Sequence, residues 1–367
     1  MLKNIILQNF RNYSKRSFEF SSNSTLIVGP NAVGKTNVLE AIYCLSTGKS
    51  FRADTEKELL QETEQVSRIA GQLENDELEI IWDNRERFQK LYRVNGVGKR
   101  QVDFAGHLLV VLFAPTDLDI VIGSPSLRRH YLDHVLSQVH KDYRLAQKIY
   151  EKAIRQRNRL LYRMKNGELS PPAGGENVND QLSYWNELLI DKGEIIHNFR
   201  KGYLDYFNSS QNTILPLELQ YDHSIISEMR LVKYKNEELA AGTTLVGPQR
   251  DDVKISYKPS LAADSTERKA ESGKRIGREL STFGSRGEQR LGVFVLKLAE
   301  LDYIEAQTGQ RPILLLDDIF SELDTENRKH ILGVIPRQQT ILTTTDIHSS
   351  EETILKKLAS ETVRLSG

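Results

Sequence analysis

The segment Gly29-Pro30-Asn31-Ala32-Val33-Gly34-Lys35-Thr36 constrains the fold of this chain more than any other segment. It has the spacing of a P-loop, and the apolar run 25–28 before it and the helical pattern 36–45 after it supply the strand and helix that this motif requires. Backbone N–H groups of such a turn bind phosphate at a helix N-terminus. We expect Lys35 to reach the β- and γ-phosphates of ATP and the Thr36 hydroxyl to ligate Mg²⁺. The sequence therefore predicts an α/β domain that takes ATP and Mg²⁺ as cofactors.

An apolar strand at 313–316 ends in two carboxylates, Asp317 and Asp318. Ligands of α/β sheets bind beyond the carboxyl ends of the strands. We therefore expect Asp317 to hold Mg²⁺ and Asp318 to orient or deprotonate the attacking water. Taken alone, this strand would be read as one that ends in a solvated acidic turn. Together with the P-loop it predicts that the catalytic residues are Lys35, Asp317 and Asp318.

A second phosphate-binding turn precedes that strand in the sequence. Its residues are Ser285, Arg286, Gly287, Glu288 and Gln289, and a helical pattern follows at 288–306. A hydroxyl group and a glycine at a helix start favour an anion, here the γ-phosphate of ATP held by another chain. The alternative is that Ser285 or Ser281 only caps the helix.

The length and composition of the chain predict a protein of two domains. A chain of 367 residues exceeds the size at which one core keeps growing, so we expect two domains. Fifty Lys and Arg balance fifty Asp and Glu, so only local segregation of charge would make a nucleic-acid surface. The single cysteine, Cys44, excludes an internal disulfide, and no run is long and apolar enough for a membrane span. A cytoplasmic location is expected.

The patterns along the chain set the expected boundaries. Residues 66–113 read as antiparallel strands with a turn at Asn95-Gly96. Residues 127–208 read as helices interrupted by a loop at 170–175, and 259–278 read as a polar loop. We expect residues 1–125 and 240–367 to form the ATPase core, lobe I. Residues 126–239 should form a mostly helical lobe II with a short helical-hairpin arm.

In order, the P-loop, the serine–glycine turn, the acidic strand end and Glu322-Leu323-Asp324 are the parts of an ABC-type ATPase, with Asp324 in its D-loop. The whole chain resembles the RecF family of bacterial recombination and gap-repair proteins. Besides these parts, the matching segments are Leu7-Gln8-Asn9-Phe10-Arg11-Asn12-Tyr13, Ser50-Phe51-Arg52, Phe113-Ala114-Pro115 with Asp117-Leu118, Ser124-Pro125 with Arg128-Arg129 and Leu132-Asp133, and Gly247-Pro248 with Arg250-Asp251-Asp252.

The resemblance implies an ABC-type head with two lobes, an ATP-dependent homodimer and weak, DNA-dependent ATP hydrolysis. It also implies binding to double-stranded or gapped DNA and partner mediator proteins that help load a recombinase. Two departures stand out. The last predicted strand continues into Thr343-Thr344-Thr345-Asp346, where many ABC ATPases have a histidine, and His348 lies slightly beyond. The signature reads Ser-Arg-Gly-Glu, which leaves the contact of Arg286 undefined.

A basic segment of the sequence is the candidate DNA-binding surface. Residues 128–165 hold eleven Lys or Arg against three acids, which suits a phosphate backbone. A solvated helix face is an equally good alternative. The candidate DNA contacts are Lys99, Arg100, Arg128, Arg129, Arg155, Arg157 and Arg159. His130 and His134 have a metal-compatible spacing, but no further ligand motif accompanies them, so Mg²⁺ is the only metal expected.

Three rival functions fit parts of the sequence. The nucleotide-binding subunit of a membrane transporter would share the P-loop, but it would not need the helical insertion. A chromosome-bridging head would need long heptad segments between its halves, and these are absent. A small-molecule kinase has no use for the turn at Ser285.

Overall fold

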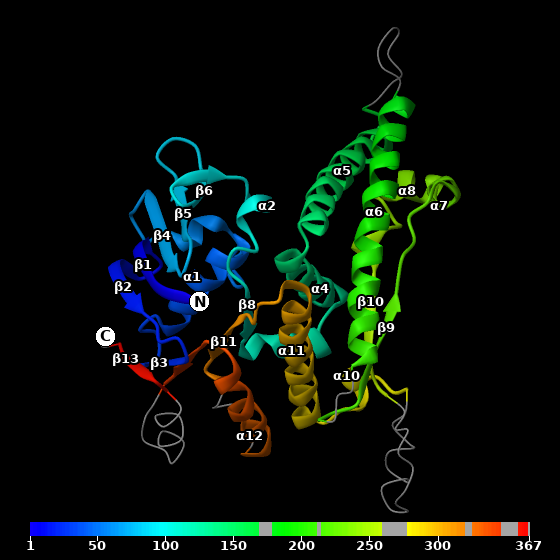
Figure 1. Ribbon diagram of the computed structural model, residues 1–367. Helices are drawn as coiled ribbons and strands as arrows, with labels where there is room; N and C mark the ends of the chain where they lie inside the picture. Colours follow the sequence, from blue (N-terminus) through cyan, green and yellow to red (C-terminus); the bar gives the residue numbers. More distant parts are fainter. Residues whose placement is uncertain (169–177, 211–213, 259–276, 320–324, 346–358, 366–367) are drawn as a thin grey trace, which may run out of the picture. The chain divides into compact units, whose positions relative to one another are not determined.

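The computed structural model describes residues 1–168, 178–210, 214–258, 277–319, 325–345 and 359–365. Two compact units make up the chain. The first unit comprises Met1–Leu118 and Ser285–Gly367, and the second comprises Asp119–Gly284. Figure 1 labels the elements of both units.

A five-stranded parallel sheet forms the centre of the first unit. Its order is β13 (Glu361–Arg364), β3 (Ser24–Val28), β12 (Thr340–Thr344), β11 (Ile313–Asp317) and β8 (Val110–Phe113). All residues of β3, β8 and β11 are buried, as expected of strands covered on both faces. The strands predicted at 25–28, 313–316 and 340–345 are confirmed, whereas β13 was not foreseen. Residues 110–113 were wrongly placed among the antiparallel strands, because β8 pairs in parallel with β11.

The second sheet of this unit is antiparallel. Its order is β2 (Tyr13–Glu19), β1 (Leu2–Phe10), β4 (Val66–Leu73), β5 (Glu77–Asp83), β6 (Gln89–Val94) and β7 (Val97–Lys99). The turn predicted between the last two strands is present. Asn95 and Gly96 have φ of 53° and 74°, which is the left-handed pair of a two-residue hairpin turn.

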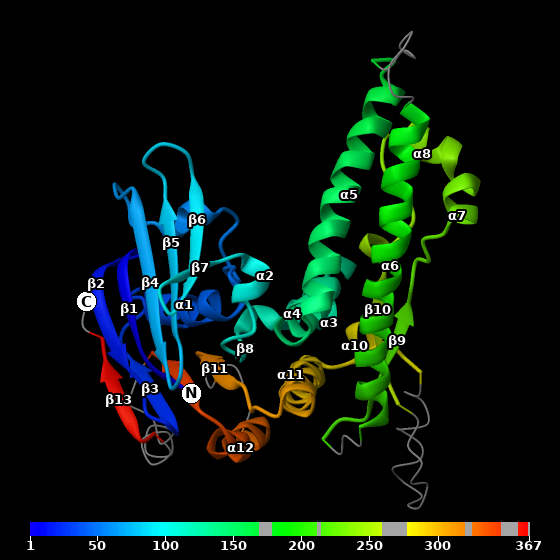
Figure 2. The same ribbon diagram turned by 45° about the horizontal axis from the view of Figure 1, so that its top comes forward.

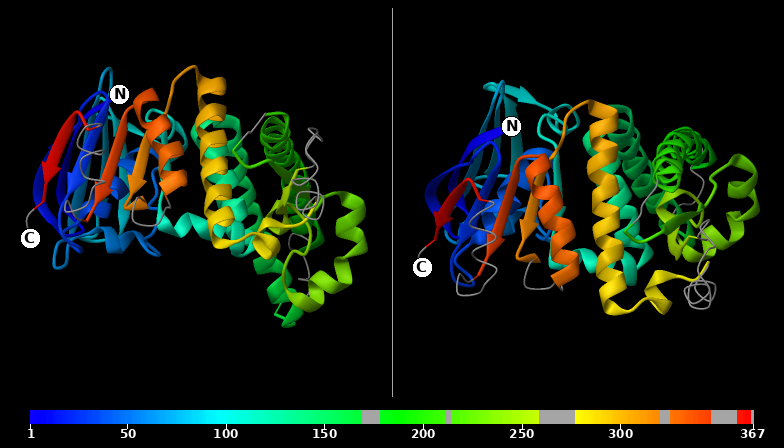
Figure 3. Two further views of the ribbon diagram at one scale, coloured as in Figure 1. Left: turned by 90° about the horizontal axis from the view of Figure 1, so that it is seen from below. Right: turned by 60° about the horizontal axis from the view of Figure 1, so that its bottom comes forward.

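Helix α1 (Lys35–Thr47) joins the two sheets. It contacts β4 and β5 of the antiparallel sheet and β8, β11 and β12 of the parallel sheet (Figure 2). Helices α11 (Arg286–Thr308) and α12 (Thr325–Val334) lie on the other face of the parallel sheet (Figure 3). The short elements of the unit are η1 (Glu56–Leu59), α2 (Gln101–Phe104), η2 (Pro115–Asp117) and η5 (Ile335–Arg337), and α3 (Leu118–Ile122) crosses into the second unit.

The second unit is mainly helical. Helices α5 (Lys141–Lys165) and α6 (Val178–Ser209) pack along each other as a helical hairpin, with α4 (Pro125–Val139) at its base. A two-stranded antiparallel sheet of β9 (Leu217–Asp222) and β10 (Asp252–Tyr257) accompanies them. The remaining elements are α7 (Glu228–Lys233), α8 (Lys235–Ala241), η3 (Pro248–Arg250) and α10 (Leu280–Phe283).

The predicted division of the chain needs correction at two places. Residues 240–284 were assigned to the ATPase core, but they belong to the second unit, because β10 pairs along the whole length of β9. Residues 119–125 also group with the second unit. Pairing between strands distant in sequence sets these boundaries. Most of the polar loop predicted at 259–278 lies outside the described residues.

A buried ionic cluster holds the helices of the second unit to the loop before β10. Arg200 on α6, whose side chain is 5% exposed, lies 2.7 Å from Asp133 Oδ1 on α4 and 2.8 Å from Asp251 Oδ2. Its guanidinium also donates to the carbonyl of Pro248 at 2.9 Å. One arginine therefore joins three segments, and its charge balances two carboxylates, of which the Asp251 side chain is 3% exposed and the Asp133 side chain 22% exposed.

Candidate nucleotide site

The P-loop is shaped by residues in left-handed backbone conformations. β3 ends at Val28 and α1 begins at Lys35, with φ of 64° at Ala32 and 105° at Gly34. A Cβ added to Gly34 would lie 2.7 Å from the Asn12 side chain and 2.8 Å from Tyr13 Oη. Both the dihedral angle and the lack of space therefore require glycine at position 34.

The turn between β1 and β2 braces this loop. Asn12 Nδ2 donates to the Val33 carbonyl at 3.0 Å, and Tyr13 Oη donates to the Gly34 carbonyl at 3.1 Å. Asn37 Nδ2 on α1 donates to Asn12 Oδ1 at 2.7 Å. Motif reasoning assigned no role to these residues. The only signal was the place of Asn12 and Tyr13 in the segment 7–13, which resembles the RecF family.

Lys35 lies folded along the P-loop. Its Nζ donates to the carbonyls of Gly29 and Pro30 at 2.7 and 2.8 Å, and the residue is 7% exposed. Burial lowers the pKa of Lys35, while the carboxylates of Asp318 and Asp317 act in the opposite direction. Because burial has removed part of its hydration, the charged form of Lys35 would be stabilised by an additional negative charge, such as that of a phosphate.

The structure brings together Thr36 and Asp317, the two residues predicted to ligate Mg²⁺. Asp317, at the carboxyl end of β11, accepts a hydrogen bond at Oδ1 from Thr36 Oγ1 at 2.9 Å. Asp318 follows in a left-handed conformation with φ of 49°, which is rare for a residue with a Cβ. Hydroxyl and carboxylate oxygens are the donors that Mg²⁺ prefers. Thr36 and Asp317 therefore fit a Mg²⁺ site.

A buried glutamate connects the first two turns of α1 to flanking segments. Glu40, which is fully buried, accepts hydrogen bonds from Arg11 Nε at 2.8 Å and Arg11 Nη2 at 2.6 Å. Ser50 Oγ donates to it at 2.6 Å, and Arg52 Nε donates at 3.2 Å. Two of the segments that resemble the RecF family thus meet at one carboxylate on the P-loop helix.

The turn at Ser285 forms the N-terminus of α11. Ser285 Oγ accepts a hydrogen bond from the Glu288 backbone N–H at 3.3 Å, and Glu288 Oε2 accepts one from the Ser285 N–H at 2.8 Å. The helix-cap alternative is therefore realised as a capping box. Ser285, Arg286 and Gly287 are exposed, and a Cβ at Gly287 would meet no atom within 4 Å. The predicted contact with ATP on another chain stays a prediction.

A buried cluster anchors α11 to the segment after β8. Lys297 Nζ lies 3.4 Å from Asp117 Oδ1 and 3.5 Å from Glu300 Oε2. Burial raises the pKa of Glu300 to about 7, although the nearby Lys297 lowers it. The helix that carries the Ser285 turn is thereby tied to η2.

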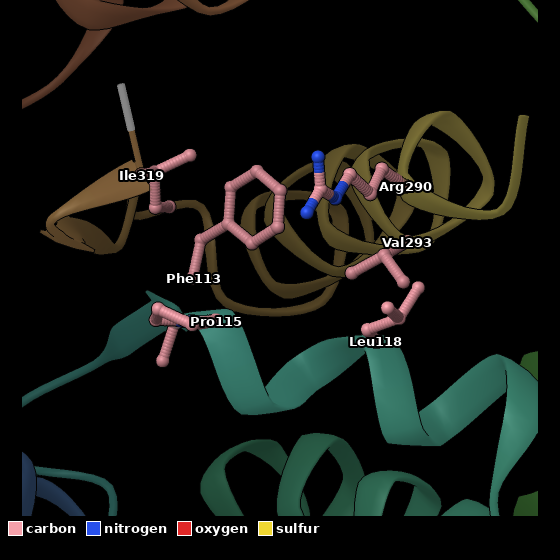
Figure 4. A pocket seen from close by; sticks show the side chains of 7 residues that line it. Phe113, Pro115, Leu118, Arg290, Val293 and Ile319 are labelled. Atoms are coloured by element: carbon pink, nitrogen blue, oxygen red, sulfur yellow. The ribbon is translucent and has the colours of Figure 1, made fainter. Parts of the chain in front are cut away.

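Figure 4 shows a small hollow in the same unit. Its lining is apolar except for Arg290, whose guanidinium lies beside the Phe113 ring, and the other lining residues are Ala114, Pro115, Leu118, Val293 and Ile319. The Phe113 ring also stacks on Phe294, with ring centroids 6.1 Å apart. The hollow offers one cation and no carboxylate.

Three of the seven candidate DNA contacts are engaged in bonds within the second unit. Arg128 pairs with Asp252 at 2.7 Å, and Arg129 donates to the Asp251 carbonyl at 2.7 Å. Arg157, 4% exposed, donates to Asn186, Thr244 and Glu238. These guanidinium groups are engaged inside the second unit, because local acids and carbonyls satisfy them.

The other four candidate DNA contacts reach the surface. Arg155, Arg159, Lys99 and Arg100 are exposed, and Arg100 forms a surface ion pair with Asp103. Several other predicted positions lie outside the described residues, namely Glu322, Leu323 and Asp324 of the D-loop, Asp346 and His348.

Within the ranges that the structure describes, no three or more His, Cys, Asp or Glu side chains gather as a metal cluster, so His130 and His134 gain no third ligand of these types. No helix in the described part of the chain has both the length and the apolar character needed to cross a membrane.

The order of the strands defines the class of protein. β12 lies between β3, which leads into the P-loop, and β11, which ends in Asp317 and Asp318. With α11 opening at the serine–glycine turn, this is the head domain of an ABC-type ATPase. The family described as RecF/RecN/SMC N terminal domain matches residues 1–360.

Full-length relatives narrow the class to one family. The DNA replication and repair protein RecF of Natranaerobius thermophilus is 34% identical over 396 aligned residues, covering 100% of this chain and 96% of the relative. The protein of the same name from Herpetosiphon aurantiacus is 33% identical and covers 96% and 95%. A solved structure of the recombination mediator protein RecF-ATPrS in the RecFOR pathway is 32% identical, has a TM-score of 0.80 and covers 96% of this chain and 93% of its own. The chain belongs to the RecF family.

Proposed function

We propose that this chain is an ATP-dependent DNA replication and repair protein that dimerises around ATP on DNA and helps to load a recombinase at gaps with mediator partners. The observation that carries the proposal is the convergence of Lys35, Thr36 and Asp317, with Thr36 Oγ1 and Asp317 Oδ1 2.9 Å apart. The names of the full-length relatives support the role in DNA repair, and the RecF-ATP relative supports the nucleotide.

Each residue of the site has a distinct task in this proposal. Lys35 and the P-loop N–H groups bind the β- and γ-phosphates. Thr36 and Asp317 hold Mg²⁺, which when bound neutralises charge on the phosphates. Asp318 orients or deprotonates the attacking water. The reaction is weak, DNA-dependent hydrolysis of ATP to ADP and phosphate.

The Ser285 turn supplies the contact between chains. Its exposed serine, the open space at Gly287 and the N-terminus of a long helix suit the γ-phosphate of ATP bound to a second copy. Binding of ATP by both chains would then close a homodimer, and hydrolysis would open it.

Sedimentation in the presence of ATP tests this shared site. In an Asp318→Asn background, which slows hydrolysis, we expect the dimer to accumulate with Mg·ATP. Adding Ser285→Arg should keep the protein monomeric while each chain still binds ATP, because a bulky cation blocks the partner's γ-phosphate contact. Analytical ultracentrifugation measures the change.

Thr282→Arg is the matched control, since it adds the same charge at an exposed position close by. It should dimerise normally. Loss of the Ser285 cap alone should cost only about 1 kcal/mol of stability. If Ser285→Arg dimerises as well as Thr282→Arg, the serine is only a helix cap.

The exposed cations of α5 are the surface that we propose for DNA. Lys148, Lys152, Arg155 and Arg159 are all exposed, and their spacing of four, three and four residues places them on one face of the helix. None of the four pairs with an acid among the described residues. This row replaces Arg128, Arg129 and Arg157, while Lys99 and Arg100 remain a second candidate surface.

Replacing the four by alanine should weaken duplex DNA binding and flatten its salt dependence. The slope of log affinity against log salt is about 0.9 per neutralised phosphate, so the slope should fall by up to about 3 to 4. Fluorescence anisotropy at several salt concentrations measures the slope.

The control is a protein in which four exposed lysines elsewhere, Lys3, Lys15, Lys57 and Lys254, are replaced by alanine. Its net charge matches that of the α5 variant. An equal loss of slope in both proteins would mean that α5 is not the DNA surface.

A further inference from the structure

Thr343 on β12 lies against both carboxylate residues of the site. It is the register partner of Asp317 in the parallel pair of β11 and β12, and it is 1% exposed. Thr343 Oγ1 lies 2.8 Å from Asp317 Oδ1. The same oxygen accepts a hydrogen bond from the Asp318 backbone N–H at 3.0 Å. One buried hydroxyl therefore joins two consecutive residues of the neighbouring strand.

The hydrogen-bonding capacity of a hydroxyl fixes the direction of these bonds. It has one proton to donate and lone pairs that accept. Because the Asp318 N–H can only donate, Thr343 Oγ1 accepts there and its own proton goes to Asp317 Oδ1. Thr36 Oγ1 donates to the same carboxylate oxygen at 2.9 Å. One hydroxyl from strand β12 and one from helix α1 thus set the rotation of the Asp317 carboxylate.

The hydrogen bond between the Asp318 N–H and Thr343 supports the left-handed backbone conformation of Asp318. A φ of 49° is disfavoured for a residue with a Cβ, and it persists only where surrounding contacts hold it. The N–H bond to Thr343 is such a contact, and it fixes where the chain turns after β11. The direction of the Asp318 side chain follows from that turn.

We infer that Thr343 is a positioning residue of the Mg·ATP site, which sets the Asp317 carboxylate for the metal and the Asp318 backbone for the water. The inference rests on the proposed function, because it presumes that Asp317 holds Mg²⁺. Groups that orient a metal ligand through a hydrogen bond commonly change metal affinity or activity 10- to 100-fold when they are removed. In the sequence, position 343 stood out only because many ABC ATPases have a histidine after this strand and this chain does not.

The chain offers closely matched variants. Thr343→Val keeps the shape and the β-branch but removes the hydroxyl, and Thr343→Ser keeps the hydroxyl. Thr344→Val makes the same chemical change at the next residue of β12, whose side chain points to the opposite face of the sheet. Thr343→Ala is a second hydroxyl-free variant, with a smaller side chain, in case valine impairs folding.

The experiment titrates the full-length protein with a fluorescent ATP analogue at increasing Mg²⁺ concentration. We expect the Mg²⁺ concentration at half-maximal effect to rise about 10- to 100-fold in Thr343→Val and Thr343→Ala. Affinity for the analogue without Mg²⁺ should change no more than about twofold, because Lys35 and the P-loop are intact. Thr343→Ser and Thr344→Val should behave as wild type.

The outcomes separate the two proposals. If both hydroxyl-free variants keep the wild-type Mg²⁺ dependence, Thr343 is an ordinary core residue and the ATP site itself is unaffected. Equal losses with and without Mg²⁺ would also overturn the inference, since they would indicate general damage to the loop. A wild-type protein that does not bind the analogue at all would instead contradict the proposed function.

Discussion

Replacing Lys35 with methionine is expected to weaken ATP binding by about 100-fold or more, which is about 3 kcal/mol. Lys35 is 7% exposed and its pKa is lowered by burial, so it gains more from a phosphate than a hydrated surface lysine does. Methionine has a similar length but brings no charge to the phosphates. Equilibrium titration with a fluorescent ATP analogue measures the loss.

Lys15→Met is the control for Lys35→Met, because it removes an exposed lysine from β2 in the same unit. It should bind ATP as wild type does. The melting temperature of Lys35→Met should stay close to that of wild type, since the substitution removes only two hydrogen bonds, both to carbonyls of the same loop. Retention of near-normal affinity would mean that the nucleotide site lies elsewhere.

The second prediction with a large expected effect concerns the stability of the second unit. Arg200→Met should lower the free energy of unfolding of this unit by about 3 to 5 kcal/mol, because it leaves Asp133 and Asp251 without their common counter-charge. Asp251 is 2% exposed and cannot recover its hydration. Hydrogen exchange followed by mass spectrometry reports on peptides of α4 and α6 separately from the first unit.

Arg155→Met is the matched change for Arg200→Met, from arginine to methionine at an exposed position of α5. It should alter stability by no more than about 0.5 kcal/mol. Adding Asp251→Asn to Arg200→Met should recover part of the loss, because the more deeply buried of the two negative charges is then removed. A loss below about 1 kcal/mol in Arg200→Met would show that water reaches the cluster.

The basic residues of α5 show why the burial of a charged residue has to be known before a binding role is assigned to it. Arg155, Arg157 and Arg159 alternate within little more than one turn of one basic helix, and in the sequence they look equivalent. Arg157 faces inward to Glu238 and Thr244, whereas the other two face solvent. Composition counts charges, but only the rotation of the helix against its neighbours decides which of them reach a ligand.

The sequence alone predicted the candidate nucleotide site wherever its parts are contiguous. The P-loop, the strand ending in Asp317 and Asp318 and the turn at Ser285 were all predicted, because a short run of residues fixes the local backbone that phosphate requires. The Asn95-Gly96 turn was predicted for the same reason, since its left-handed dihedral angles depend on two residues.

Only the tertiary structure decided which distant residues meet. The bond between Thr36 and Asp317 spans 281 positions, and Thr343 reaches Asp317 because β12 lies beside β11. The boundary of the second unit depends on the pairing of β9 with β10, and the role of Asp251 depends on Arg200. These contacts follow from strand order and burial, which no local window of the sequence contains. The sequence by itself therefore determined the local motifs and the chemistry they offer, and the packing decided which side chains support them.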